Sequence, residues 1–176
     1  MRGIVRMAAV VAGLLVVLAV AGVLYARSTG LNSRAVPGPL ETRAARMVRS
    51  LAVPAGAKAL ANPVKPTGLA LDAGLQHFAR YCALCHGNDG SGEKIPLGKL
   101  FPRPPDLRAQ PTQDLTDGEL FYIIENGVRF TGMPAFGSDT PNPAGEELAW
   151  QLVLFIRRLP KISNDEIGQM QGLNPL

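Results

Sequence analysis

The chain has 176 residues and a formal net charge of +4 at pH 7, and 47% of its residues are hydrophobic but only 6% aromatic. This length allows one domain of ordinary size with additional segments. Residues 28–66 carry six basic side chains against Glu41 alone, whereas residues 67–176 carry nine basic and thirteen acidic side chains. The acidic part has no basic stripe interleaved with aromatics, so we expect no nucleic-acid partner, and an anionic membrane surface suits the basic segment better.

The first predicted element is an apolar helix. Residues 7–25 form an uncharged run of nineteen residues with arginines on both sides. At about 1.5 Å per residue this run spans about 28 Å, close to the thickness of one hydrocarbon core. A signal peptide cleaved after residues 19–21 is the alternative, but the apolar run continues past that site, which favours a retained anchor. We therefore predict a single membrane anchor over residues 1–27, with the rest of the chain exported in either case.

Residues 28–66 form a predicted basic linker, because five prolines interrupt any long helix. Within it, residues 40–52 could form one amphipathic helix, with arginines facing water or lipid head groups. A solvated spacer is the equal alternative. The apolar side of the helix would consist of Leu40, Ala44, Met47, Val48 and Leu51.

The next predicted helix covers residues 68–82, with Thr67 as its cap. Leu71, Leu75 and Phe78 are spaced for one buried face. A glycine inside this helix, Gly74, costs stability unless another backbone or ring packs closely against it. We therefore expect a close helix contact at Gly74.

Cys82, Cys85 and His86 form a CxxCH motif at the end of this helix. Residues i and i+3 share a helix face, so both thiols can bond the vinyl groups on one edge of a haem, with His86 as the proximal iron ligand. A structural zinc site needs four ligands, but the chain has two cysteines and two histidines in total. Thiol redox chemistry needs a preceding strand, whereas the residues before Cys82 predict helix. The motif therefore predicts one covalently bound haem c.

A turn-forming cluster, residues 87–92, follows the motif, and residues 94–111 are rich in proline. We expect residues 94–111 to form an irregular loop around one edge of the haem. A proline carbonyl in this loop could accept a hydrogen bond from the outer nitrogen of His86 and orient its ring. The sequence leaves open which proline does so.

Thr116 and Glu119 form a capping box that opens a helix ending at Asn126-Gly127. In the following loop, Met133 stands between a glycine and a proline, a position suited to a thioether ligand for the sixth coordination site of the iron. The alternatives for that site are Met170, His77 or an open position.

Residues 145–159 predict a helix that is apolar on a broad face and ends at Pro160. Its expected partner is the Gly74/Phe78 face of the helix over residues 68–82. Ser163 and Glu166 then cap a short last helix. These boundaries give a haem domain over residues 67–160 and a C-terminal tail over residues 161–176.

The chain resembles class I c-type cytochromes, specifically the membrane-anchored monohaem kind found in bacteria. The resemblance covers about residues 67–160. It implies a small all-α fold around one haem c, His86/Met133 axial ligation and packing of the first helix of the domain across the last. The long proline-rich loop and the basic linker depart from the family pattern. The residues that carry the resemblance are Gly74, Phe78, Cys82, Cys85, His86, Met133, Trp150 and Phe155.

These features predict an electron-transfer protein, not an enzyme, held by one helix in the bacterial inner membrane with its haem domain in the periplasm. A thioether ligand raises the reduction potential, which suits electron exchange with a terminal oxidase or a quinol-oxidising complex. Permanent membership of a larger oxidase or reductase complex is the main alternative. A haem sensor or enzyme with an open sixth position is a further one.

Overall fold

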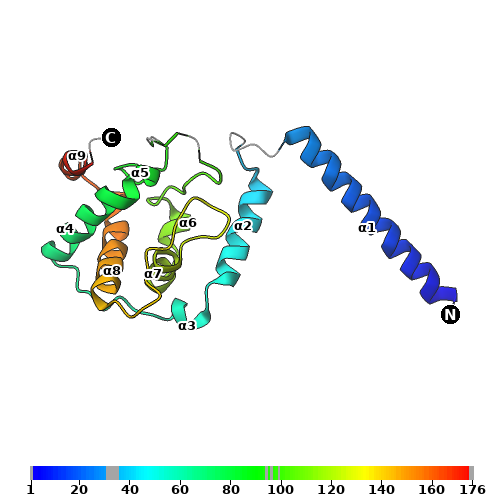
Figure 1. Ribbon diagram of the computed structural model, residues 1–176, viewed down its shortest axis with the longest axis horizontal. Coiled ribbons are helices and arrows are strands. Elements are labelled where there is room, and N and C mark those ends of the chain that lie inside the picture. The colour runs from blue at the N-terminus through cyan, green and yellow to red at the C-terminus, as the bar shows by residue number, and fades with distance from the viewer. Residues whose placement is uncertain (1, 31–35, 94, 96, 99, 175–176) are drawn as a thin grey trace. The chain divides into compact units, whose positions relative to one another are not determined.

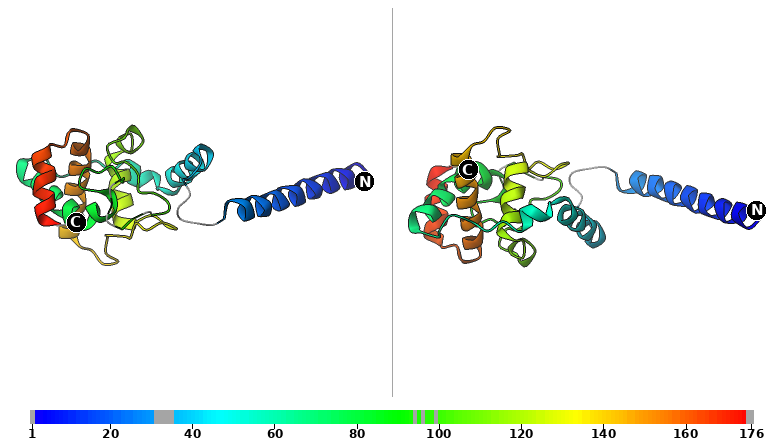
Figure 2. Two further views of the ribbon diagram at one scale, coloured as in Figure 1. Left: turned by 90° about the horizontal axis from the view of Figure 1, so that it is seen from above. Right: turned by 90° about the horizontal axis from the view of Figure 1, so that it is seen from below.

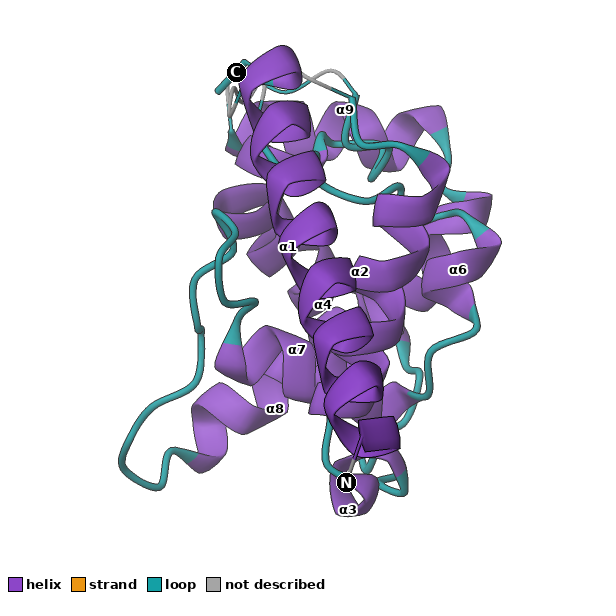
Figure 3. Ribbon diagram, turned by 90° about the vertical axis from the view of Figure 1, so that its right-hand side faces the viewer, coloured by secondary structure: helices purple, strands orange, loops and turns teal. Residues whose placement is uncertain are grey.

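A computed structural model describes residues 2–30, 36–93, 95, 97–98 and 100–174 of the chain. All regular elements in these residues are helical, as predicted (Figures 1 and 3). The chain divides into two units, Met1–Ala35 and Val36–Leu176. Residues 31–35 of the predicted linker, and residues 94, 96 and 99 of the predicted loop, lie outside the described residues.

The first unit contains helix α1, Arg2–Thr29, which includes the predicted apolar run. Its mean hydropathy reaches 2.8, and it is the one helix among the described residues that is long and apolar enough to cross a membrane. The described side chains of this helix are almost entirely exposed. These properties fit the predicted membrane anchor.

The second unit begins with α2, Pro39–Ala52, and the short α3, Ala55–Lys58. The predicted helix over residues 40–52 is therefore formed. Helix α3 packs against α7, Asp117–Asn126, because Gly118 leaves room for the backbone carbonyl of Ala57. The hydroxyl of Thr116 also donates a hydrogen bond of 2.9 Å to the Lys58 carbonyl. The end of the basic segment is thus attached to the helical domain.

Helix α4, Gly68–His77, begins as predicted, since the Thr67 hydroxyl accepts a hydrogen bond from the Ala70 amide. The prediction of one regular helix to residue 82 is wrong in its last turn. Residues Phe78–Cys82 form a π-helical turn, in which the Ala83 amide bonds the Phe78 carbonyl, and α5, Ala83–His86, follows. The extra residue in this turn lets Phe78, Ala79 and Ala83 all face the core.

The short α6, Gln110–Gln113, ends the predicted irregular loop. The predicted capping box at Thr116 is confirmed: the Glu119 amide donates to the Thr116 hydroxyl, and the Thr116 amide donates to the Glu119 carboxylate. Helix α7 ends before Gly127, as predicted.

Helix α8, Pro143–Arg158, begins two residues earlier than predicted because Asn142 caps it and Pro143 occupies its first turn. A 3₁₀ turn, η2 (Leu159–Lys161), separates it from α9, Asn164–Leu173. The capping box at Ser163 is confirmed. After α9, the side-chain amide of Asn174 donates hydrogen bonds of 2.5 Å to the Ala79 carbonyl and 2.9 Å to Asn88 Oδ1. The end of the chain is therefore fastened to the π-helical turn.

The core lies where α4 crosses α8, with α9 beside α4 (Figures 1 and 2). The expected contact at Gly74 is confirmed: a Cβ there would meet the Gln151 carbonyl and lie 2.9 Å from Phe155 Cβ. Beside it, the rings of Phe78 and Phe155 pack at a centroid distance of 5.2 Å. The rings of Phe121 and Trp150 stack at 4.1 Å, which joins α7 to α8.

We expect Gly74→Ala to destabilise the protein by about 1–3 kcal/mol, because the new methyl group meets backbone that cannot yield without separating α4 from α8. The matched control is Gly168→Ala in α9, where no atom of the described residues outside the adjoining helix backbone lies within 4 Å of the added carbon. The control should gain about 0.5–1 kcal/mol from helix propensity alone. Urea unfolding of the haem-loaded protein measures both values, and equal effects of the two substitutions would contradict the close helix contact.

Candidate haem-attachment site

Cys82 ends the π-helical turn and Cys85 lies in α5, and both are half-buried free thiols. Burial, with a smaller effect of Cys85, raises the pKa of Cys82 to about 12. Burial also raises the pKa of Cys85. Catalytic redox thiols have lowered pKa values in positively charged surroundings. The environment of this pair therefore does not suit thiol–disulfide exchange.

His86, directly after Cys85, is half-buried at the end of α5. Burial lowers the pKa of its imidazole, and a backbone hydrogen bond with Pro105 acts in the opposite sense. Its Nδ1 atom is buried, and no described residue offers that atom a hydrogen bond of full geometry. Among the prolines that the sequence left open, Pro105 is the one whose backbone affects the pKa of the ring, without a hydrogen bond of full geometry to Nδ1. Such an acceptor orients a ligating imidazole and raises its basicity.

A glycine turn brings the proline-rich loop to His86. Gly92 has a φ of 67°, and its amide donates a hydrogen bond of 2.8 Å to the His86 carbonyl. A Cβ on Gly92 would lie 2.5 Å from the Pro104 carbonyl oxygen and 3.3 Å from that of Pro105. Only glycine therefore lets the backbone before and after the loop approach this closely.

Arg108 joins the two sides of this turn. Its guanidinium donates hydrogen bonds of 2.9 and 3.0 Å to the Asp106 carboxylate and one of 3.3 Å to Asp89. The hydrogen bond from Arg108 is the main reason that the pKa of Asp106 lies below its ordinary value. The Leu107 amide also donates to the Gly90 carbonyl at 2.9 Å. The sequence analysis did not single out Arg108, because its contact with Asp89 joins segments 19 residues apart that no local pattern pairs.

Met133 lies in the loop between α7 and α8, and its side chain is half-buried. The Val128 amide donates to the Met133 carbonyl at 3.2 Å, and the Met133 amide donates to the Thr131 hydroxyl at 3.1 Å. These bonds close a tight turn with Phe130 at its tip, at a φ of 62° and 93% exposed. The two cysteines and His86 thus share one helical segment, whereas Met133 belongs to a separate, internally hydrogen-bonded loop.

The alternative ligands named above occupy different surroundings. Met170 is fully buried in the hydrophobic core, so its sulfur is enclosed by packed side chains. His77 is half-buried, and its ring lies 4.7 Å from that of Tyr81. Over the described part of the chain, no group of three or more His, Cys, Asp or Glu side chains could hold a metal ion, so the ligand set of a zinc site is not assembled there.

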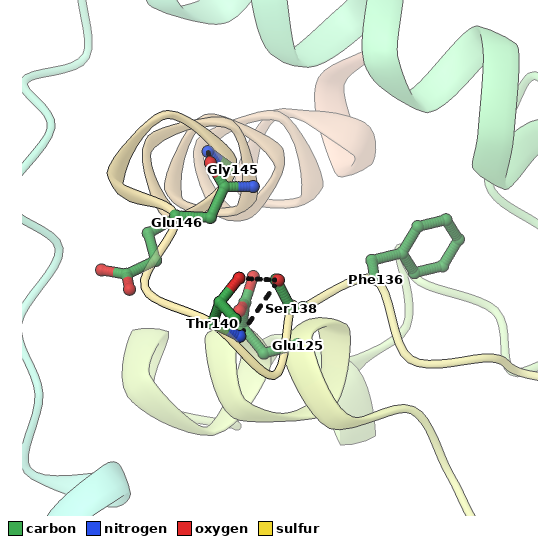
Figure 4. A pocket seen from close by; sticks show the side chains of 8 residues that line it. Glu125, Phe136, Ser138, Thr140, Gly145 and Glu146 are labelled. Atoms are coloured by element: carbon green, nitrogen blue, oxygen red, sulfur yellow. Dashed lines mark hydrogen bonds between the residues drawn. The ribbon is translucent and has the colours of Figure 1, made fainter.

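A small polar pocket lies at the far end of the Met133 loop (Figure 4). Glu125, Ser138, Thr140 and Glu146 contribute to its lining, and the Thr140 amide donates to the Ser138 hydroxyl at 3.2 Å. Burial, with a smaller effect of Glu146, raises the pKa of Glu125. None of the predicted haem-binding residues lines this pocket.

The residues at the CxxCH motif fit a covalently bound haem. The two thiols are free, and the buried Nδ1 of the adjacent imidazole lies where the Pro105 backbone affects the pKa of the ring. An all-helical domain with such a motif defines the class of c-type cytochromes.

Residues 69–156 match the family described as cytochrome c oxidase, cbb3-type, subunit III, and the chain belongs to this family. A comparison with curated proteins gave no match. Family membership gives the protein a covalently bound haem c, an electron-carrier role and redox partners in respiratory complexes.

We expect Gly92→Ala to raise the reduction potential by some tens of millivolts, because it moves the Pro105 carbonyl away from His86 and weakens the support of the ferric state. For one electron, a tenfold change in that support corresponds to about 59 mV. The control is Gly98→Ala, at a glycine of similar φ (77°) where, apart from its chain neighbours, no atom of the described residues lies within 4 Å of the added carbon. Potentiometric titration measures both variants, and an equal shift in the two would assign the effect to backbone strain.

Proposed function

We propose that the protein carries single electrons between membrane respiratory complexes on the periplasmic face of a bacterial inner membrane, with one haem c. Cys82 and Cys85 are the thioether attachment points, His86 is the proximal ligand and Met133 the distal one. The observation that carries this proposal is the CxxCH segment at the end of a helix, with the Pro105 carbonyl acting on His86.

When bound, the haem supplies exchange between ferrous and ferric iron. The protein contributes position and electronic tuning. The segment from α4 to α5 would carry both attachment points, and the Pro105 carbonyl, which already affects the pKa of His86, would orient the imidazole in the haem-loaded protein. A thioether from Met133 favours the reduced state and so raises the reduction potential. This range of potentials suits a terminal oxidase as acceptor or a quinol-oxidising complex as donor, and the chain itself needs no catalytic residue.

The proposal is tested by visible spectra of Met133→Ala made in a strain with cytochrome c maturation. The wild-type ferric protein should show a weak far-red absorption from sulfur-to-iron charge transfer, and the variant should lose it and bind carbon monoxide when reduced. Met47→Ala, an exposed position on α2, is the matched control and should keep the band. If Met133→Ala kept the band, another residue would be the ligand. A wild type that lacks the band and binds carbon monoxide readily would be a sensor or an enzyme.

The second candidate function is that of a permanent subunit in a larger oxidase, and the family description as an oxidase subunit favours it. Gentle detergent extraction of native membranes distinguishes the two functions. A carrier separates from its partners during purification and still reduces an oxidase in solution. Recovery in constant stoichiometry with a membrane-embedded oxidase subunit would instead establish the permanent subunit.

A further inference from the structure

Helix α2 contacts the helical domain through its polar side. Thr42 and Arg49 are its only half-buried residues, and they lie seven residues apart, which is two turns of one face. Burial, with the nearby Arg46 charge, lowers the pKa of Arg49, and the Glu119 carboxylate of α7 raises it. The Lys58 amine also donates a hydrogen bond of 2.6 Å to the Ser50 carbonyl. The side of α2 that faces the domain is therefore the side that carries Arg49.

The opposite side of α2 is an exposed apolar stripe. With 3.6 residues per turn, the stripe lies about half a turn of the helix wheel from Arg49. A surface helix normally turns such a stripe toward its own core. Here the orientation is reversed, so the stripe needs a cover from outside the domain. Its largest members and their exposed fractions are Leu40 82%, Met47 62%, Val48 65% and Leu51 80%.

The charges beside the stripe point to an anionic surface as that cover. Arg43 and Arg46 are exposed and lie to one side of the stripe, and Glu41 is the only acid in the helix. Arginine can bury its aliphatic stem beside apolar groups while its guanidinium reaches phosphate oxygens. An apolar stripe flanked by arginines is typical of helices that lie in the plane of a lipid surface.

The chain length keeps α2 near a membrane if α1 spans it. Residues 30–38 join α1 to α2, and this connection reaches at most about 32 Å when fully extended. The helix is thus held close to lipid at a high effective concentration, so even a weak surface affinity suffices for contact.

We propose that α2 lies on an anionic lipid surface, with the stripe at the boundary between head groups and acyl chains. The domain, attached to the polar side of α2, is then held at the membrane in one orientation. This inference requires that α1 is retained as an anchor, but it does not depend on the ligands of the haem iron.

The test uses the full-length haem-loaded protein in vesicles of phosphatidylglycerol and phosphatidylethanolamine. A nitroxide label is attached through Met47→Cys in the stripe or through Ala45→Cys, an exposed position outside the stripe. Collision rates with oxygen, which concentrates in lipid, and with a water-soluble nickel chelate are measured by electron paramagnetic resonance. The label at 47 should collide mainly with oxygen and the label at 45 mainly with nickel. The lipid signal at 47 should decrease in vesicles of phosphatidylcholine alone and in Arg43→Gln/Arg46→Gln.

Three results would overturn the proposal. Equal access of nickel to both labels would make α2 a solvated spacer. Protection of position 47 from both reagents would indicate a protein partner, and spin–spin broadening would indicate a second copy of the chain. The unsubstituted protein is the labelling control: nitroxide uptake there would reveal free Cys82 or Cys85, which would be a failure of the haem proposal alone.

Discussion

The close approach of α4 and α8 at Gly74 is the constraint on which the rest of the helical domain depends. A glycine at this crossing brings the Gln151 backbone and the Phe155 side chain against α4. The Phe78–Phe155 ring pair then fixes the point at which α4 changes into the π-helical turn. Because the CxxCH motif begins at Cys82, the last residue of that turn, the position of the thiols depends on packing one and two helical turns before it.

The surroundings of His86 depend on a different kind of contact, which is made between loop segments and not between helices. The Pro105 carbonyl is placed by two features, the absence of a side chain at Gly92 and the bonds that Arg108 makes to Asp106 and Asp89. The helical core therefore positions the two thiols, and the loops position the Pro105 carbonyl. Substitutions in the helical core should therefore change mainly the free energy of unfolding, whereas substitutions in the loops should change mainly the reduction potential.

Local sequence patterns predicted most of the helices because caps and apolar spacing are local signals. The capping boxes at Thr116 and Ser163 and the helix contact at Gly74 are confirmed. The π-helical turn escaped prediction, since the need to bury Phe78, Ala79 and Ala83 together arises only against a packed neighbour. Which proline carbonyl acts on His86 could not be predicted either, because that also depends on contacts between separate segments. Periodicity also found the stripe on α2 but could not tell which way it faces, because that is decided by the contacts of Arg49.

The hydrogen bonds of the Asn174 side chain can form only late in the synthesis of the chain. Its amide bonds the Ala79 carbonyl, 95 residues earlier in the chain, and also Asn88 on the other side of the CxxCH motif. At about 5–20 residues per second of synthesis, roughly 5–20 s separate the emergence of the two partners. Throughout that interval, Ala79 and Asn88 lack their hydrogen bonds from Asn174. Until Asn174 emerges, the segment between Ala79 and Asn88 is therefore held by two hydrogen bonds fewer than in the folded chain.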